Sequence, residues 1–199
     1  MLNVLILGTN SQIGNAVRNY LLDNTDDHVT LLGNGLSKKE YDSQRQTIIA
    51  GSIDDKRQID FAMRDQDVVV VCLCKDVDVK IEKIIAAMKK SDLSRIIFVG
   101  FMGPYEQKPS VQEAARNATY KTLQPFANAH KELKDSDLDY TIIRSNWVTQ
   151  GPINYEVNIG GMPFIEQDVS LDQIASLINQ LVERRHLYER QTIGINTPL

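Results

Sequence analysis

The sequence contains few cysteines and histidines and no long apolar run, and each shortage excludes a class of protein. Two cysteines and three histidines occur among 199 residues. Cys72 and Cys74 stand two positions apart at the end of a predicted strand, so we expect both to point to one face as buried, reduced thiols. No His or Cys cluster completes a metal site. No apolar run approaches the roughly 20 residues that span a bilayer, which predicts a cytoplasmic protein without membrane contact.

An excess of positive charge is absent as well. The formal net charge is −4 at pH 7, so electrostatics give no reason to expect binding to nucleic acid. A predicted core strand begins within the first four residues, without a basic segment or a cleavage site, so we expect no signal peptide. The remaining composition, 42% hydrophobic and 24% charged, is that of an ordinary globular protein and predicts one domain over residues 1–199.

One stretch near the N-terminus organises the rest of the chain. Val4 to Leu7 is a short apolar run, typical of a strand buried on both faces. Apolar residues then recur at the spacing of a helix, at positions 13, 16, 17, 20 and 21. The turn between them begins at Gly8 and ends at Gly14. A helix N-terminus at such a turn offers free N–H groups and partial positive charge to a phosphate. The alternative is a plain strand–turn–helix whose glycines serve only packing.

Strand and helix patterns alternate along the rest of the chain. Strands are predicted at 28–32, 47–50, 67–73, 95–100, 138–144 and 191–196, and helices at 77–90, 111–133 and 174–182. We expect the apolar run 67–73 to be a central strand. We expect Asp54 to cap a helix directly after it that carries apolar residues at 59 and 61–63, and Ser170 to cap the last helix. Residues 155–159 and 162–165 flank two glycines and predict a small hairpin. The order predicts a Rossmann-type doubly wound parallel α/β sheet with helices on both faces and a small C-terminal hairpin and helix.

Several of these segments resemble landmarks of the short-chain dehydrogenase/reductase superfamily. The loop from Gly8 to Gly14 resembles the G-x-x-G-x-x-G loop of its atypical NAD(P)H-binding branch, which includes NmrA-like proteins and relatives of NAD-dependent epimerases. Ser11 takes the place of the middle glycine. Three further segments match the branch in order and spacing, so that the resemblance covers nearly the whole chain: Gly51–Asp55 (G-D-x-x-D), Leu138–Ser145 (L-D-Y-T-I-x-R-P) and Val169–Ala175 (V-S-x-x-D-[IV]-A).

The resemblance implies a dinucleotide bound across the carboxyl ends of the strands. It assigns to the cofactor the glycine loop and the residues that follow the later strands: Gly8, Thr9, Asn10, Ser11, Gln12, Ile13, Gly14, Gly33, Asn34, Gly51, Ser52, Ile53, Leu73, Cys74 and Phe101. The second strand ends in Gly33-Asn34-Gly35, without the carboxylate that bonds the ribose hydroxyls of NAD. Lys38 and Lys39 follow, either as ligands of a 2′-phosphate or as solvated charges. We therefore expect NADP in preference to NAD.

The catalytic Ser, Tyr and Lys of the superfamily have no counterparts in this sequence. The fifth strand ends without a serine, and no Tyr-x-x-x-Lys spacing follows it. Tyr105 is the one weak catalytic candidate. Apolar and aromatic residues near the expected nicotinamide site instead predict a substrate pocket for a flat molecule, formed by Met102, Tyr105 and Trp147 beside Phe101. Trp147 fits core packing equally well.

Two functions therefore remain open. The first is an NAD(P)H-dependent reductase of a small, flat acceptor such as a quinone or a flavin, because hydride transfer to such a molecule needs only a nicotinamide held against it with water excluded. The second is a non-catalytic, NmrA-like redox sensor that binds NAD(P) and a regulatory protein partner. A homodimer is compatible with either function.

Overall fold

The structure, a computed structural model, describes residues 1–36, 44–101, 114–145, 148–160 and 168–198, with the backbone alone at 101 and 114–122. The strands are β1 (Asn3–Leu7), β2 (His28–Gly33), β3 (Gln46–Ala50), β4 (Val68–Val71), β5 (Arg95–Phe101), β6 (Asp139–Ser145), β7 (Val148–Thr149), β8 (Glu156–Ile159), β9 (Val169–Ser170) and β10 (Gln191–Asn196). The helices are α1 (Gln12–Asn24), α2 (Lys56–Ala62), α3 (Val77–Lys90), α4 (Ala114–Asp135) and α5 (Leu171–Glu183).

An eight-stranded sheet in the order β3-β2-β1-β4-β5-β6-β10-β8 forms the centre of the molecule. Its neighbouring strands are parallel except for β8, which runs antiparallel to β10. β7 and β9 form a separate parallel pair. The first six strands have the order of a Rossmann fold, so the predicted doubly wound parallel sheet is confirmed. The parallel pairing brings the carboxyl ends of β1 to β4 to one edge.

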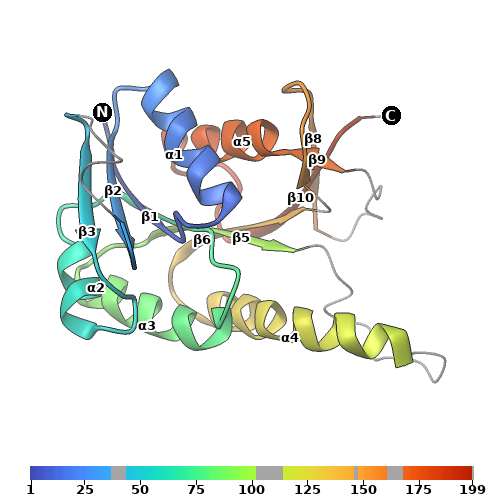
Figure 1. The fold of residues 1–199 in the computed structure, drawn as a ribbon, viewed down its shortest axis with the longest axis horizontal. Coiled ribbons are helices and arrows are strands. Elements are labelled where there is room, and N and C mark those ends of the chain that lie inside the picture. Colours follow the sequence, from blue (N-terminus) through green and yellow to red (C-terminus); the bar gives the residue numbers. More distant parts are fainter. Residues whose placement is uncertain (37–43, 102–113, 146–147, 161–167, 199) are drawn as a thin grey trace.

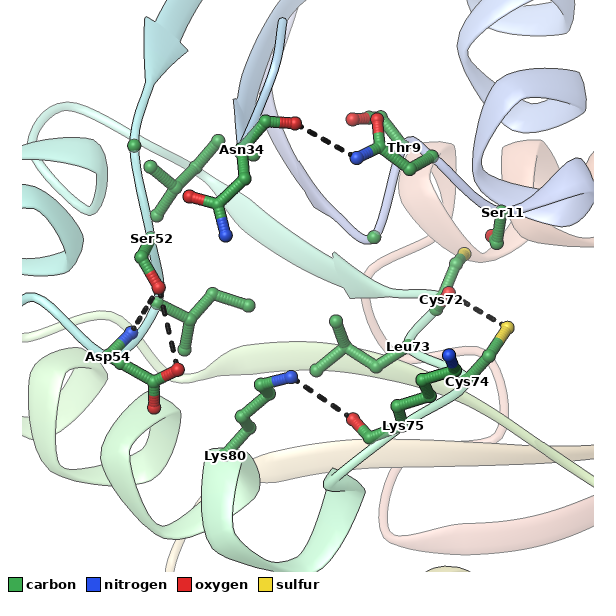
Figure 2. A pocket seen from close by; sticks show the side chains of 16 residues that line it. Thr9, Ser11, Asn34, Ser52, Asp54, Cys72, Leu73, Cys74, Lys75 and Lys80 are labelled. Carbon is green, nitrogen blue, oxygen red and sulfur yellow. Dashed lines mark hydrogen bonds between the residues drawn. The ribbon is translucent and has the colours of Figure 1, made fainter.

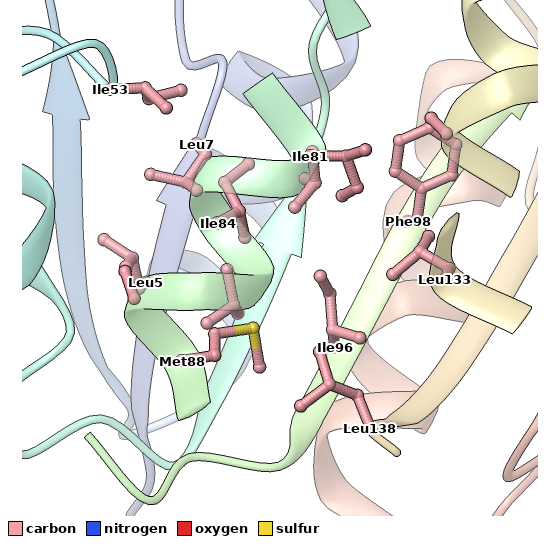
Figure 3. Close-up of a cluster of buried hydrophobic side chains, with 14 of the residues drawn as sticks. Leu5, Leu7, Ile53, Ile81, Ile84, Met88, Ile96, Phe98, Leu133 and Leu138 are labelled. Carbon is pink, nitrogen blue, oxygen red and sulfur yellow. The ribbon is translucent and has the colours of Figure 1, made fainter. Parts of the chain in front are cut away.

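Helices cover both faces of the sheet (Figure 1). α1 and α5 lie on one face, and α2, α3 and α4 lie on the other. Each face has its own apolar core. Figure 3 shows the core between α3, α4 and the sheet, where Ile81, Ile84 and Phe98 have 0–1% of their surface exposed. The second core packs α1 against α5 through residues such as Val17 and Ile178.

The run of four valines in β4 explains why this strand lies in the middle of the sheet. The valines from Val68 to Val71 have 0–2% of their surface exposed, and β4 pairs with β1 on one side and β5 on the other. Burying each side chain contributes about 1.5 kcal/mol or more. A β-branched run of this kind is stable only where apolar groups cover both faces, so the predicted position of the strand is confirmed.

The starts of three helices are set by side-chain caps. Ser11 caps α1, Asp55 caps α2, and Ser170 forms a capping box with Gln173 at α5. The prediction that Asp54 caps α2 is wrong by one position, because the Asp55 carboxylate accepts the N–H groups of Arg57 and Gln58. Such caps contribute about 1 kcal/mol each.

The C-terminal strands differ in detail from the predicted hairpin. β8 agrees with the predicted strand at 155–159, and its antiparallel partner in the structure is β10. The predicted partner at 162–165 lies outside the described residues. β10 and α5 agree with the predicted last strand and last helix.

Arg95 ties this C-terminal region to the sheet. It has 2% of its surface exposed and donates hydrogen bonds to Thr141 Oγ1 (2.8 Å) and to the backbone oxygens of Asp139 (3.1 Å), Leu181 (3.5 Å) and Leu187 (3.3 Å). Burial lowers the pKa of Arg95 to about 10. The guanidinium thus satisfies carbonyl groups near the end of α5 that a helix leaves without partners.

Candidate functional site

A cavity of about 330 Å³ lies where β1, β2, β3 and β4 end (Figure 2). Predicted cofactor residues from four separate segments line it together: Gly8, Thr9, Asn10, Ser11, Gly33, Asn34, Gly51, Ser52, Ile53, Leu73 and Cys74. Leu32, Asp54, Cys72, Lys75 and Lys80 complete the lining. The parallel topology therefore gathers in one place residues that are up to 72 positions apart in the sequence, from Gly8 to Lys80.

The other predicted site residues do not line this cavity within the described part of the chain. Gln12, Ile13 and Gly14 form the first turn of α1, directly after the lining residues. Phe101 ends β5, where only the backbone is described. The predicted substrate-pocket residues Met102, Tyr105 and Trp147, and the predicted phosphate ligands Lys38 and Lys39, lie outside the described residues.

The glycines of the loop after β1 are required by close packing. Gly8 has a φ of +93°, and a Cβ atom there would lie 2.5 Å from the backbone oxygen of Cys72. A Cβ atom on Gly14 would lie 2.4 Å from the backbone oxygen of Gly8. Any side chain at these positions would collide with backbone, so the loop folds back tightly on itself and on the end of β4.

The loop presents donors at the N-terminus of α1. Ser11 Oγ accepts the N–H of Gly14 at 2.9 Å, a bond that does not use the hydroxyl hydrogen of Ser11, and the same hydroxyl interacts with the Cys74 thiol. The N–H groups of Gln12 and Ile13 belong to the first turn and have no partner within the helix. Together with the positive end of the helix dipole, these donors form a cradle for an anion such as a phosphate.

A buried hydroxyl beside the loop also lacks a partner. Thr9 has 4% of its surface exposed, and among the described residues its Oγ1 has no hydrogen-bond partner. Leaving a buried hydroxyl unsatisfied costs about 1–3 kcal/mol. Because Thr9 lines the cavity, a polar ligand there can remove this cost.

The end of β2 carries amides and no carboxylate. Asn10 Nδ2 donates to the backbone oxygen of Asn34 at 3.0 Å and so links the loop after β1 to the end of β2. The side-chain amide of Asn34 points into the cavity (Figure 2). An amide can both donate and accept, and it does not repel a phosphate.

The loop after β3 is held by a side chain from α2. Gln58 Oε1 accepts the backbone N–H of Ser52 at 2.6 Å. A Cβ atom on Gly51 would lie 2.1 Å from the same oxygen. Asp54 does not cap α2, because Asp55 does. Asp54 forms an ion pair with Lys83 of α3 instead. The hydrogen bond from Lys83 is the main reason that the pKa of Asp54 lies below its usual value, so the carboxylate is ionised at neutral pH.

The two thiols have different environments, so the expectation that both are buried is wrong for one of them. Both are free, with Cys72 buried and Cys74 exposed. β4 ends at Val71, one residue before Cys72, so strict alternation between faces no longer applies. Burial raises the pKa of both thiols. Cys74 therefore contributes a protonated, weakly polar thiol to the cavity.

A second cavity, of about 310 Å³, lies at the start of α5 and shares no lining residue with the first. Its most buried group is Gln173, whose Nε2 donates to the backbone oxygens of Pro152 (3.1 Å) and Asn154 (2.5 Å). Gln173 Oε1 accepts from the N–H of Ser170 at 2.8 Å. These bonds already satisfy Gln173, which therefore fixes the local structure.

Neither a membrane span nor a metal site is present among the described residues. None of their helices is long and apolar enough to cross a membrane. No group of three or more His, Cys, Asp or Glu side chains in the described ranges is placed to hold a metal ion. The cavity at the strand ends is thus the described site with the clearest capacity for a ligand.

Comparison with known families agrees with this geometry. A sequence model of the NAD(P)H-binding family matches residues 8–185. The chain belongs to this NAD(P)H-binding family. The match begins at the first glycine of the loop and continues beyond α5, so it includes every element that lines the cavity. The resemblance to the atypical short-chain dehydrogenase/reductase branch is thereby confirmed.

Two solved structures are similar to this chain over nearly its full length. A Rossmann-fold NAD(P)-binding family protein from Shigella flexneri is 32% identical, with a TM-score of 0.83, and the match covers 100% of this chain and 94% of that one. A wide-type short-chain dehydrogenase/reductase from Veillonella parvula, in complex with NADP, is 26% identical, with a TM-score of 0.88 over 99% and 95% of the two chains.

A more distant structure shares the fold alone. ChuY, an anaerobillin reductase from Escherichia coli, is 18% identical, with a TM-score of 0.83 over 98% of this chain and 97% of that one. No curated protein matches the sequence.

The residues of the cavity fit a dinucleotide. The tight glycine loop brings backbone and the Ser11 hydroxyl to one point, as a pyrophosphate requires. Thr9 Oγ1, which has no partner among the described residues, and the inward amide of Asn34 are polar groups of the kind that a ribose can bond. Sequence reasoning missed Asp54 and Lys80 as lining residues. The sole signal available for Lys80 was its place in the first turn of the helix after β4.

Proposed function

We propose that this protein is an NADPH-dependent oxidoreductase of the atypical short-chain dehydrogenase type, which reduces a small, flat acceptor such as a quinone or a flavin. The proposal rests on the cavity at the ends of β1 to β4, where a phosphate cradle and polar groups for a nucleoside lie side by side. A bound NADPH supplies a hydride, and the residues of this chain bind and orient it.

The cradle holds the pyrophosphate. The Ser11 hydroxyl and the N–H groups of Gln12 and Ile13 donate to its oxygens, at the positive end of α1. Thr9 Oγ1 and the Asn34 amide bond the ribose that follows. The Asn10–Asn34 contact, at 3.0 Å, keeps the two sides of this site at a fixed separation.

The charges around the cavity favour NADP over NAD. The three described residues directly after β2, 34–36, include no Asp or Glu, so none of them repels a 2′-phosphate or selects free ribose hydroxyls. Lys75 and Lys80 line the cavity and give it positive charge. The neighbour from Veillonella parvula was solved with NADP, and the same choice is proposed here.

The expected chemistry needs no Tyr–Lys pair. A quinone or flavin accepts a hydride directly, and solvent can supply the accompanying proton, whereas a ketone requires a positioned acid. Phe101, Met102, Tyr105 and Trp147 are proposed to surround the acceptor. Tyr105 remains a weak candidate for a proton donor.

Titration with NADPH and NADH, followed by cofactor fluorescence, tests the proposal. Ser11→Glu places a carboxylate in the phosphate cradle, and like charges near 4 Å repel by about 1–4 kcal/mol. We expect this variant to weaken NADPH binding tenfold or more while keeping its fold, because negative charge at a helix N-terminus is favourable. Asn19→Glu adds the same charge to an exposed position further along α1 and is expected to bind as the wild type does.

Menadione added to the NADPH complex then separates the two candidate functions. Oxidation of NADPH with turnover supports the reductase. Tight binding without oxidation of NADPH by menadione or by any quinone or flavin tested refutes the reductase and favours the NmrA-like sensor. If neither nucleotide binds, the cradle is a packing feature and both functions fail.

A further inference from the structure

The proposed binding of NADPH assigns no bond to one thiol in the cavity. Cys74 is exposed and lines the cavity together with Ser11 and Lys75. Figure 2 shows the Cys74 side chain on the side of the cavity that Ser11 forms. The Ser11 hydroxyl interacts with this thiol, and the charge of Lys75 acts on it. A molecule held in the phosphate cradle therefore lies next to a sulfur atom that is able to react with it.

Cys74 differs in this respect from Cys72, two positions earlier. Cys72 has 3% of its surface exposed, so reagents do not reach it in the folded protein. Burial raises the pKa of Cys74 as well, although Ser11 and Lys75 oppose this shift. Little of the Cys74 thiol is therefore ionised at neutral pH, and the thiolate is the form that attacks a disulfide. A reagent that only collides with Cys74 reacts slowly, so a reagent that the cavity holds has the advantage.

The charges around the cavity favour negatively charged molecules. Two carboxylates lie in or beside the lining, and each is paired with a lysine: Asp54 with Lys83, and Asp76 with Lys80. The charge of Lys75, which also lines the cavity, and the partial positive charge at the N-terminus of α1 add to these balanced pairs. An anionic reagent is therefore concentrated beside the thiol, whereas a cationic reagent is not.

A buried hydroxyl in the same cavity calls for a ligand independently of the thiol. Thr9 has 4% of its surface exposed, and its Oγ1 has no hydrogen-bond partner among the described residues. It lines the cavity together with Ser11 and Asn34. The carboxylates and amides of a peptide form hydrogen bonds with hydroxyl and amide groups, as phosphates do. The cavity therefore suits a small, peptide-like anion as well as a nucleotide.

We propose that Cys74 is a site of reversible S-thiolation by an anionic disulfide of low molecular weight, and that the attached group excludes NADPH from the cavity. The modification rests on the proposed function, because it regulates the binding of NADPH to the same cavity. The disulfide reacts only while the cavity is free of nucleotide, and bound NADPH protects the thiol. The protein therefore keeps its cofactor where NADPH is abundant and loses it where disulfide accumulates.

The reaction is a thiol–disulfide exchange, which needs no further reagent. The Cys74 thiol loses its proton to water, and its sulfur attacks one sulfur of the disulfide. The bond between Cys74 Sγ and that sulfur forms as the original S–S bond breaks. The second half of the disulfide leaves as a thiolate and takes up a proton from water. Cys74 is thus oxidised, the leaving sulfur is reduced, and an added thiol reverses the exchange.

Glutathione disulfide, which carries net negative charge, is the probe that tests the modification. After incubation, peptide mapping by mass spectrometry should find one glutathionyl group on Cys74 and none on Cys72. The modified protein should bind NADPH at least about tenfold more weakly than untreated protein, because the tripeptide takes up the hydrogen bonds of the cradle. Dithiothreitol should restore the binding, and saturating NADPH during the incubation should prevent the modification.

Cys74→Ser is the control for the site of reaction. It should take up no glutathionyl group, and its dissociation constant for NADPH should be the same before and after treatment with glutathione disulfide. Because the comparison is made within this variant, any effect of the substitution itself on NADPH binding cancels.

A change of charge in the cradle tests why an anionic reagent is selected. Cystamine is a cationic disulfide, and the ratio of the rates with glutathione disulfide and with cystamine cancels any change in the reactivity of the thiol. Ser11→Glu adds negative charge beside Cys74, so this ratio should fall about fivefold or more. Asn19→Glu adds the same charge about 12 Å further along α1, beyond the Debye length, and should keep the wild-type ratio.

The outcomes separate the thiolation of Cys74 from the proposed function. If untreated protein binds NADPH but Cys74 stays unmodified, or if the modified protein binds NADPH as before, the thiolation is refuted and the proposed function stands. An equal ratio of rates in the wild type and in Ser11→Glu refutes the selection of an anionic disulfide by the cavity. If untreated protein binds neither NADPH nor NADH, the proposed function fails, and the regulation of NADPH binding fails with it.

Discussion

Ser11 has two separable roles, and replacing it by alanine or glycine distinguishes them. Its Oγ accepts the Gly14 N–H at 2.9 Å, and its backbone, at φ −82° and ψ 155°, suits any residue. Removing the cap therefore introduces no strain. Ser→Ala at an N-cap costs about 1 kcal/mol, whereas Ser→Gly costs a few tenths. At about 2–4 °C per kcal/mol for a chain of this size, Ser11→Ala should lower Tm by about 2–4 °C and Ser11→Gly by less than about 1 °C.

The second role appears when NADPH is present. Ligand at about 100 times its Kd stabilises the wild type by about 2.7 kcal/mol. Both variants lack the hydroxyl that we propose to donate to phosphate, so at the same NADPH concentration each should lose about half of this gain, which corresponds to about tenfold weaker binding. Thermal unfolding by circular dichroism, with and without NADPH, measures both effects. The reasoning is refuted if the two variants have the same Tm without ligand, or if both retain the full NADPH-dependent stabilisation.

Three further predictions concern other parts of the chain. Arg95→Met should lower the free energy of unfolding by about 3 kcal/mol in urea titrations, because the backbone oxygens of Asp139, Leu181 and Leu187 lose a donor; a loss below about 1 kcal/mol would contradict this role. A maleimide should label Cys74 and not Cys72 in the folded protein, at a rate that still rises above pH 9 because the Cys74 pKa is raised, and NADPH should slow the labelling. Gly8→Ala should yield little folded protein on expression, since its Cβ would lie 2.5 Å from a backbone oxygen; a wild-type Tm would refute the packing argument.

Much of the fold could be predicted from local sequence patterns, because each of these patterns is compatible with one kind of element in one kind of environment. The valine run of β4 needs cover on both faces, and α3, predicted over 77–90, has the same limits in the structure. Details that depend on a single residue were less predictable. Asp54 and Asp55 are chemically identical cap candidates, and only the path of the loop decides between them. Cys74 is exposed because β4 ends before the alternation of faces reaches it.

The site was predictable where topology alone determines it. Parallel strands place their carboxyl ends together, so Gly8, Asn34 and Ser52 line one cavity although they lie on different segments. Lys80 could not be placed in this way, because the direction in which the first turn of α3 faces depends on how that helix packs against the sheet. The pairing of Asp54 with Lys83 likewise joins residues 29 positions apart, and no local pattern encodes it.

The packing of α1 against α5 has a consequence for how the protein is made. All the residues that line the cavity at the ends of β1 to β4 have been synthesised by position 80, whereas α5 ends at Glu183. Until α5 leaves the ribosome, the buried face of α1, including Val17 and Leu21, has no helix to cover it. α1 therefore has only the sheet to pack against through most of translation. A nascent chain should therefore acquire its affinity for nucleotide late. This should happen in the step in which α5 covers the apolar face of α1, which until then is accessible to chaperones.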